Sequence, residues 1–221
     1  MKDNFFIDNL PYNRRLFNKM IFLGSEFIEC KNKPEGDYFH FHIQRSEKEI
    51  IKGIEHIKII SKSKDVIYFK NEKIHREDDK PAILYHGVGS FWYKDGVPHR
   101  DNDLPACIFD NGTKEWHKDG KIHREGKPAI VFDNANEQEW FVDGLRHREN
   151  DLPAKVINFE KYVLEIWYLN DKIMRRTHNP SLIIKNSDYK EWYLNGKIVT
   201  EEEYEENWLK ENIENFKEVK L

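Results

Sequence analysis

A unit of about 24 residues repeats along this chain and constrains its fold more than any other feature. Its clearest copy is Trp-His-Lys-Asp-Gly-Lys-Ile-His-Arg at 116–124, and two looser copies begin at Trp167 and Trp192. In four copies a His is followed by Arg and then by Pro-Ala, and an aromatic residue stands seven positions before the His. A fixed period of this kind predicts a repeat array. The histidines are His75, His99, His123 and His147, and the aromatic residues are Tyr68, Trp92, Trp116 and Trp140.

The centre of each unit predicts a tight hairpin. Asp-Gly stands at 95–96, 119–120 and 143–144, and Asn-Gly at 195–196. These pairs favour a two-residue type I′ turn, which needs positive φ at both positions. The register that follows pairs each aromatic residue with the His of its copy, and it sets Glu115 opposite Arg124 and Glu139 opposite Arg148. We therefore expect structural roles for Trp92, His99, Trp116, His123, Trp140 and His147.

The segment after each His-Arg predicts a second strand. It passes through a short acidic loop into Pro-Ala and an apolar run such as Ala129-Ile130-Val131-Phe132. Pro suits the start of a strand, where its missing N–H interrupts no ladder. The expected fold is mainly β, an antiparallel β-meander of about six hairpin repeats.

The segment Trp-Tyr-Lys-Asp-Gly-Val-Pro-His-Arg at 92–100 and its copies resemble a MORN-type repeat, in the variant Trp-x-x-Asp-Gly-x-x-His-Arg…Pro-Ala. The resemblance covers residues 64–200. It implies a repeat protein of the kind found in bacteriophages and large DNA viruses, mostly of unknown role. Better-known members carry Gly after the His where this chain has Arg, so membrane-lipid attachment does not carry over.

Two flanking regions complete the expected organisation. Residues 1–63 are expected to form a small α+β region, with a half-buried strand at 37–43. A capping box at Ser46 is expected to begin a helix, whose apolar face would be Ile50, Ile51, Ile54 and Ile57. Residues 201–221 are expected to form an amphipathic helix that caps the array and covers its last strand.

Composition limits the cellular setting and the partners. The chain has 221 residues, 34% of them charged, and a formal net charge of −4, which is less typical of a nucleic-acid-binding protein. Two cysteines do not make a disulfide framework, so a reducing, cytoplasmic location is expected. We find no signal peptide and no run long enough to span a membrane.

The regular histidines suggest metal ligands, but their spacing opposes this. Equivalent positions in neighbouring copies lie two strands apart, about 9.6 Å, whereas zinc–nitrogen bonds are about 2 Å long. His40 and His42 share a strand face and are the better pair, with Glu29 or Cys30 as a third ligand if their strand is adjacent. We predict no metal and no cofactor, with His40 and His42 as the alternative.

Two further functions have weaker support. The Arg ladder and nearby aromatic residues would suit nucleic acid or a nucleotide, but an acidic residue follows each Arg closely. No Gly-rich phosphate loop, nucleophile elbow or paired-carboxylate motif is present, so an enzyme would need a site in residues 1–63.

A protein-binding surface is the preferred hypothesis. The residues next to each aromatic position point to the other face of the sheet and vary between copies. An exposed row of aromatic residues and Arg is typical of interfaces. The candidates are Tyr93, His117, Phe141, Arg146, Tyr168 and Tyr193. Together with the viral resemblance, this predicts a non-catalytic binding protein, with an inhibitor of a host antiviral nuclease complex as one version.

Overall fold

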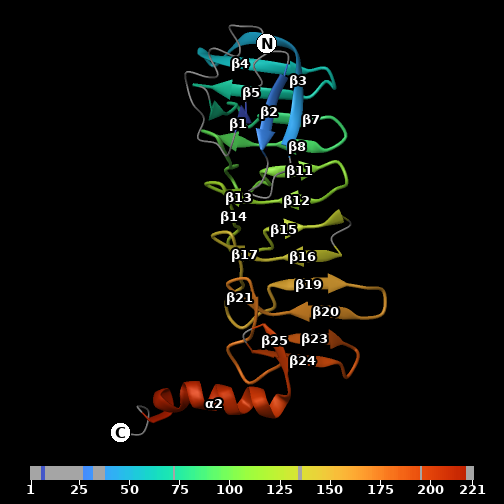
Figure 1. Ribbon diagram of the computed structural model, residues 1–221, viewed down its shortest axis with the longest axis vertical. Helices are drawn as coiled ribbons and strands as arrows, with labels where there is room; N and C mark the ends of the chain where they lie inside the picture. Colours follow the sequence, from blue (N-terminus) through green and yellow to red (C-terminus); the bar gives the residue numbers. More distant parts are fainter. Residues whose placement is uncertain are drawn as a thin grey trace. The chain divides into compact units, whose positions relative to one another are not determined.

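The computed structural model describes residues 6–7, 27–31, 38–71, 73–133, 136–194 and 196–217, and for 6–7, 27–31, 38–43, 45 and 211–217 the backbone only. The fold is mainly β, an antiparallel hairpin meander with one C-terminal helix among the described residues, as the repeat predicts (Figure 1). It divides into two compact units, residues 1–111 with 116–120, and residues 112–115 with 121–221.

The first unit holds β1 (Phe6–Ile7), β2 (Phe27–Lys31), β3 (Tyr38–Ile51), β4 (Ile54–Ser61), β5 (Val66–Lys70), β6 (Lys73–Ile74), β7 (Ile83–Tyr85), β8 (Gly89–Phe91), β9 (Tyr93–Lys94), β10 (Val97–Pro98), β11 (Cys107–Phe109) and β13 (His117–Lys118). The second holds β12 (Lys114–Glu115), β14 (Lys121–Ile122), β15 (Ile130–Val131), β16 (Glu137–Glu139), β17 (Phe141–Val142), β18 (Leu145–Arg146), β19 (Lys155–Asn158), β20 (Val163–Ile166), β21 (Tyr168–Leu169), β22 (Lys172–Ile173), β23 (Leu182–Lys185), β24 (Lys190–Leu194), β25 (Lys197–Val199) and α2 (Glu201–Lys217).

Each complete copy contributes to two separate sheets. One strand pair joins a long sheet, as β7 with β8 and β19 with β20 do. The chain then bends at the aromatic residue and forms a short hairpin, as β9 with β10 and β17 with β18 do. The sequence predicted one continuous ladder, and the structure divides it at the bend.

The predicted hairpin register is confirmed within the short hairpins. Phe141 pairs with Arg146, and Tyr168 pairs with Ile173. The N–H of His99 donates to the carbonyl of Trp92 at 3.1 Å. The φ angles of 51° at Asp95 and 94° at Gly96 show why Asp-Gly stands in this turn, because both residues occupy the left-handed region.

The predicted pair of Glu139 with Arg148 is wrong. Because the chain bends at Trp140, Glu139 belongs to β16 of the long sheet and lies opposite Lys155 of β19. Its carboxylate forms ion pairs with Lys155 and with Arg146, while the guanidinium of Arg148 covers the Trp140 ring. The hairpin register therefore does not continue past the bend.

The predicted helix after Ser46 is also wrong. Strands β3 and β4 form a hairpin there, closed by Lys52 at φ 51° and Gly53 at φ 75°. The many isoleucines favour a strand over a helix, and the Lys-Gly turn fixes the pairing. Strand β4 then pairs with β5, so this region continues directly into the first repeat. The described part of residues 1–63 consists of strands and turns.

The core of the second unit lies between its two kinds of sheet. Phe141 of the hairpin β17–β18 is 6% exposed and packs with Ala129 and Ile130 of the preceding Pro-Ala segment, and the partly buried Ile122 and Phe132 close the cluster. The Ala of every Pro-Ala pair is fully buried, because the strand that begins there passes directly beneath the aromatic bend of the preceding segment. The alanines are Ala82, Ala106, Ala129 and Ala154.

Helix α2 begins with the predicted capping box. The N–H of Glu203 donates to Thr200 Oγ1 at 3.1 Å, and the N–H of Thr200 donates to Glu203 Oε2 at 2.9 Å. Tyr204 is 2% exposed and donates its hydroxyl to the Arg175 carbonyl, and Trp208 Nε1 donates to the Arg176 carbonyl at 2.9 Å. The helix thus lies on the last repeats; Ile198, a predicted contact, is 61% exposed instead.

We predict that Phe141→Ala lowers the free energy of unfolding by about 3–5 kcal/mol, because it empties a packed core position. Urea unfolding measures this loss. Tyr189→Ala is the control, since Tyr189 is 51% exposed. Equal stability of the two variants would contradict the placement of Phe141 in the core.

We predict that Tyr204→Ala destabilises the second unit by about 2–5 kcal/mol, because it removes a buried ring and its hydrogen bond. Leu209→Ala, at a position 50% exposed on the same helix, is expected to change stability by less than about 0.5 kcal/mol. Thermal melts of both variants test whether α2 is docked as described.

Candidate functional site

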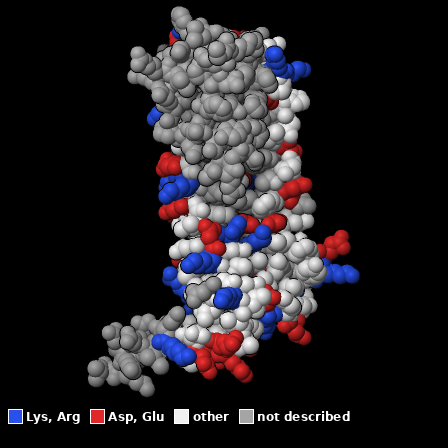
Figure 2. All heavy atoms as spheres, viewed as in Figure 1, with Lys and Arg blue, Asp and Glu red and all other residues white. Residues whose placement is uncertain are grey.

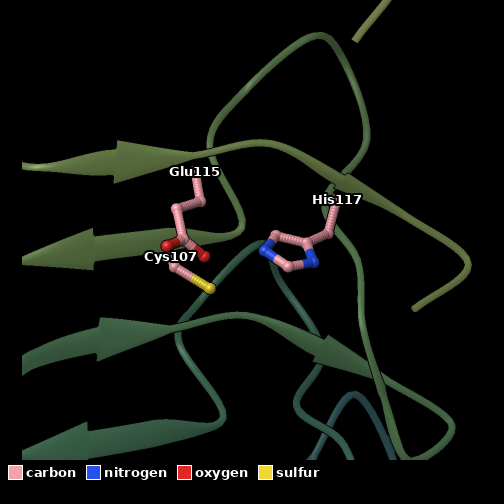
Figure 3. Close-up of side chains that lie close together, drawn as sticks. All are labelled: Cys107, Glu115 and His117. Atoms are coloured by element: carbon pink, nitrogen blue, oxygen red, sulfur yellow. The ribbon is translucent and has the colours of Figure 1, made fainter. Parts of the chain in front are cut away.

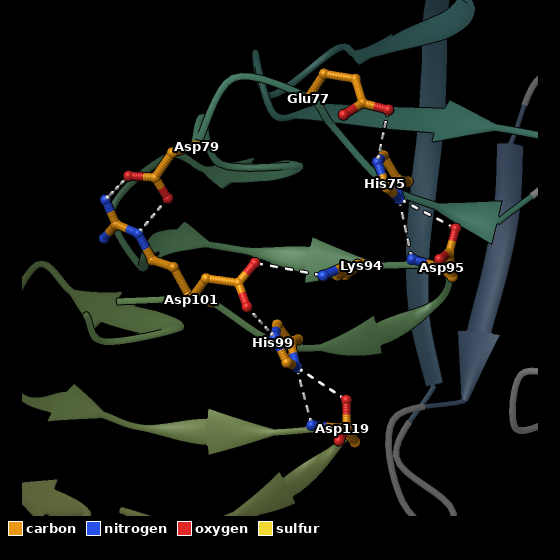
Figure 4. Close-up of polar contacts among 9 residues, drawn as sticks. His75, Glu77, Asp79, Lys94, Asp95, His99, Asp101 and Asp119 are labelled. Atoms are coloured by element: carbon orange, nitrogen blue, oxygen red, sulfur yellow. Dashed lines mark hydrogen bonds and ion pairs between the residues drawn. The ribbon is translucent and has the colours of Figure 1, made fainter. Parts of the chain in front are cut away.

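Three histidines of the repeat connect their copy to the next one. His75 Nδ1 accepts the N–H of Asp95, in the following Asp-Gly turn, at 3.1 Å, and His99 Nδ1 accepts the N–H of Asp119 at 3.0 Å (Figure 4). His123 repeats the contact with Asp143 at 3.2 Å in the second unit. This link requires a constant distance along the chain and gives a physical reason for the equal steps.

In three copies the other nitrogen of the ring contacts an acidic residue two positions later. His75 Nε2 lies 3.2 Å from Glu77, and His99 Nε2 lies 2.9 Å from Asp101 (Figure 4). Since Nδ1 accepts a backbone N–H, Nε2 carries the proton of the neutral ring and donates it to the carboxylate. His75 and His99 are thus structural, with both nitrogens engaged within the protein, whereas Nδ1 of His147 is buried without a hydrogen-bond partner.

In four copies the aromatic residue is covered by the Arg of the same copy, a contact that the sequence did not predict. Cζ of Arg100 lies 3.8 Å from the centroid of the Trp92 ring, and Cζ of Arg175 lies 4.0 Å from the centroid of the Trp167 ring. Nη1 of each Arg also donates to the carbonyl of its own Pro, at 3.2 Å from Arg100 to Pro105. These arginines therefore hold the bend to the Pro-Ala segment.

A single aspartate completes this arrangement in two copies. Asp79 accepts hydrogen bonds from Arg100 Nε and Nη2 on its two carboxylate oxygens at 2.7 and 2.9 Å (Figure 4). Its backbone carbonyl accepts the Nε1–H of Trp92 at 3.0 Å. Asp151 does the same for Arg175 and Trp167. Both aspartates have positive φ, 49° and 52°, which turns the carbonyl toward the indole.

The six predicted surface residues are more enclosed than expected. Phe141 is buried, so the expectation that it is exposed is wrong, and the other five are half-buried. Arg146 Cζ lies 4.9 Å from the Tyr168 ring and 5.1 Å from the Phe141 ring, so the structure brings these three together. Burial raises the pKa of Tyr193 to about 12, and its hydrogen bond to Glu191 adds to the shift. At Phe141, the bend at Trp140 turns this face toward the long sheet.

Exposed aromatic residues stand elsewhere, on the turns of the long sheet in the second unit. Phe159 and Tyr162 lie in the turn from β19 to β20 and are 45% and 42% exposed, with ring centroids 4.6 Å apart. Tyr189, 51% exposed, lies at the turn from β23 to β24. We name these three residues the aromatic edge. Sequence reasoning missed them, although aromatic residues in stretches otherwise typical of turns were a usable signal.

Strand pairing brings the two turns of the aromatic edge together. Strand β20 pairs with β23, with Val163 opposite Lys185. Val163 follows Tyr162 directly, and Ile184 donates its N–H to the Tyr189 carbonyl. The two turns therefore lie at the same end of neighbouring hairpins, as the second unit shows in Figure 1.

A second feature of this unit is a cavity beneath α2. It has a volume of about 310 Å³ and is lined by Leu169, Met174, Arg175, Arg176, Leu194, Tyr204 and Trp208. Its lining is mixed, with the polar groups of Arg175 and Arg176 beside apolar residues such as Leu169. Several of its wall atoms are already hydrogen-bonded between the helix and the repeat.

Metal ligation was predicted to be absent, with His40 and His42 as the alternative pair. Their strand is adjacent to that of Glu29 and Cys30, as the alternative required, and Glu29 lies opposite His40. Their side chains lie outside the described part. Elsewhere in the first unit, ligand atoms of Cys107 and His117 lie within 4.8 Å of each other (Figure 3).

No family model matches the sequence, and no curated protein or solved structure matches it either. The resemblance to MORN-type repeats therefore stays a prediction. Among the described residues, no helix has the length and apolar character needed to cross a membrane.

We predict that the contact of Asp79 with Arg100 makes stability depend on acid pH. The hydrogen bond from Arg100 lowers the pKa of the Asp79 carboxyl in the folded state. A lowered folded pKa contributes stability above the unfolded value, near 4, and this contribution is lost as pH falls through the folded pKa. Urea unfolding between about pH 7 and pH 2 should therefore show a smaller acid loss in Asp79→Asn. Asp188→Asn, in an exposed turn, should keep the full acid loss; matching profiles for all three proteins would contradict the assignment.

Proposed function

We propose that this chain is a non-catalytic protein-binding repeat protein and that the aromatic edge is its contact surface. The observation that carries the proposal is the group of three exposed aromatic rings on two adjacent turns. Exposed rings of this size cost free energy in water, and tyrosine and other aromatic residues supply much of the energy of protein interfaces.

The surroundings of the aromatic edge suit a protein partner. Glu160, Lys161 and Asp188 are exposed in the same turns. Apolar rings within a polar rim of both charges are the usual arrangement of a non-obligate interface. The short hairpin turns also hold the rings in place before binding, which lowers the entropy cost of association.

The nature of the partner rests on the resemblance. Arrays of this variant in viral proteins favour a host protein, and one version of the proposal is inhibition of an antiviral nuclease complex in the reducing cytoplasm. The aromatic edge supports protein binding in general and does not select among partners.

Nucleic-acid binding through the Arg ladder has less support. The guanidinium groups of Arg100 and Arg175 are each already surrounded by a carboxylate, a Pro carbonyl and an aromatic ring. A phosphate would have to displace these internal partners. Basic and acidic side chains are interspersed on the face of the second unit in Figure 2, with acidic residues gathered on the first turn of α2. The enzyme alternative, with a site in residues 1–63, falls largely outside the described residues.

The test compares capture of a partner by the wild type and by Phe159→Ala/Tyr162→Ala/Tyr189→Ala. Quantitative mass spectrometry after affinity capture from host lysate identifies the partner, and calorimetry with the purified partner measures affinity. We expect the triple variant to lose about ten-fold or more in affinity with an unchanged melting temperature.

A matched control shows whether a loss of affinity comes from the aromatic edge itself or from removing any exposed apolar side chains. Leu145 and Leu152 are each 43% exposed in the same unit, and Leu145→Ala/Leu152→Ala should keep its affinity. Equal affinity of the triple variant and the wild type would place binding elsewhere. A gel shift with single- and double-stranded nucleic acid at several salt concentrations tests the alternative.

A further inference from the structure

One copy of the repeat lacks the aspartate that holds Arg and Trp together in others. The loops before Trp92 and Trp167 read Glu77-Asp78-Asp79-Lys80-Pro81 and Glu149-Asn150-Asp151-Leu152-Pro153. The loop before Trp140 reads Glu125-Gly126-Lys127-Pro128. It is one residue shorter, and the missing residue corresponds to Asp79 and Asp151.

The shorter loop leaves Trp140 without its usual acceptor. Trp92 and Trp167 donate Nε1–H to the carbonyls of Asp79 and Asp151 at 3.0 Å. Trp140 is 8% exposed, and its Nε1 is buried without a hydrogen-bond partner. A buried unpaired N–H is costly, so it marks a place where an acceptor would stabilise the protein.

The same loop leaves Arg148 without a carboxylate. Arg148 keeps the other contacts of its position, with Cζ 3.9 Å from the Trp140 ring and Nη1 donating to the Pro153 carbonyl at 3.3 Å. Among the described residues no carboxylate lies within ion-pair distance of it; the nearby Glu165 pairs with Lys185. Burial lowers the pKa of Arg148, as expected for a guanidinium that lacks a close counter-ion.

We propose that a carboxylate from outside the chain binds Arg148 Nε and Nη2, at the position that the side chain of Asp151 occupies on Arg175. The donor geometry is that of Arg175, where the two distances to the carboxylate are 2.8 and 2.7 Å. The flat guanidinium fork matches a carboxylate with two parallel hydrogen bonds, and the ring beneath holds the fork in place. The ligand is a free carboxylate or the acidic side chain of a protein.

Acetate is the first probe, followed through the Nε–H signals of Arg148 and Arg175 in ¹H–¹⁵N spectra of the full chain. We expect acetate to shift Arg148 Nε–H to saturation, and the indole N–H of Trp140 with it, beyond any shift that chloride causes at equal ionic strength. Arg175 should not respond, because Asp151 already occupies it. No acetate-specific shift at Arg148 would overturn the proposal.

Two variants make the test independent of a single signal. Inserting Asp between Gly126 and Lys127 supplies the carboxylate internally, and it should raise the melting temperature and abolish the acetate response at Arg148. Asp151→Ala should create an acetate response at Arg175. An insertion variant that still responds to acetate as the wild type does would also overturn the proposal.

The source of the carboxylate is decided with a second probe, acetyl-Gly-Asp-Gly-amide. Tighter binding of this peptide than of acetate supports an acidic side chain of a protein, and equal or weaker binding supports a small free carboxylate. The proposal does not depend on the aromatic edge, and the alanine variants of that edge should leave the acetate response unchanged.

Discussion

The stacking of Arg on the aromatic residue of the same copy is the contact on which the repeat depends. The chain bends at this aromatic residue, so the ladder is interrupted there and side chains must hold the two sheets in place. The guanidinium does so by covering the ring and donating to the Pro carbonyl at the start of the following strand. Arg suits this role because it is planar, always charged and forms several directed hydrogen bonds at once. Lys could not replace it.

Other recurring residues follow from that bend. Ala after Pro is fully buried in four copies, and Ser181 takes the same buried place in a later one. The strand that starts there lies beneath the bend, since the Trp92 N–H donates to the Ala106 carbonyl at 2.7 Å. The His adds the link between copies by accepting an N–H of the next Asp-Gly turn. Trp, His-Arg and Pro-Ala thus form one connected set of contacts, which explains why they recur together.

Departures from the repeat are the more informative positions for function. A residue that recurs in most copies serves packing, as Ala106 and Arg100 do. The aromatic edge occurs on only two turns and has no packing role that accounts for its exposure. The short loop at 125–127 leaves an arginine and an indole incompletely paired where other copies are complete. Both features lie in the second unit. The aromatic edge offers exposed rings that a partner could cover, and the short loop leaves hydrogen-bond donors that a ligand could pair.

The period and the turn dipeptides by themselves determined the mainly β fold, the two-residue turns, the pairing of the short hairpins and the helix cap at Thr200. These follow from local rules, since Asp-Gly requires positive φ and pairing spreads outward from the turn. Local rules could not reveal the bend at each aromatic residue, because nothing in a strand pattern shows where a ladder ends. The bend alone moved Glu139 to the long sheet, placed Arg148 on Trp140 and turned the predicted binding face of Phe141 inward. Likewise, the isoleucines at 50–57 satisfied a helical spacing, but this segment forms the end of β3, a Lys-Gly turn and the start of β4, which pair with each other. Side-chain position across a repeat depends on contacts between distant segments, and only the tertiary structure decided it.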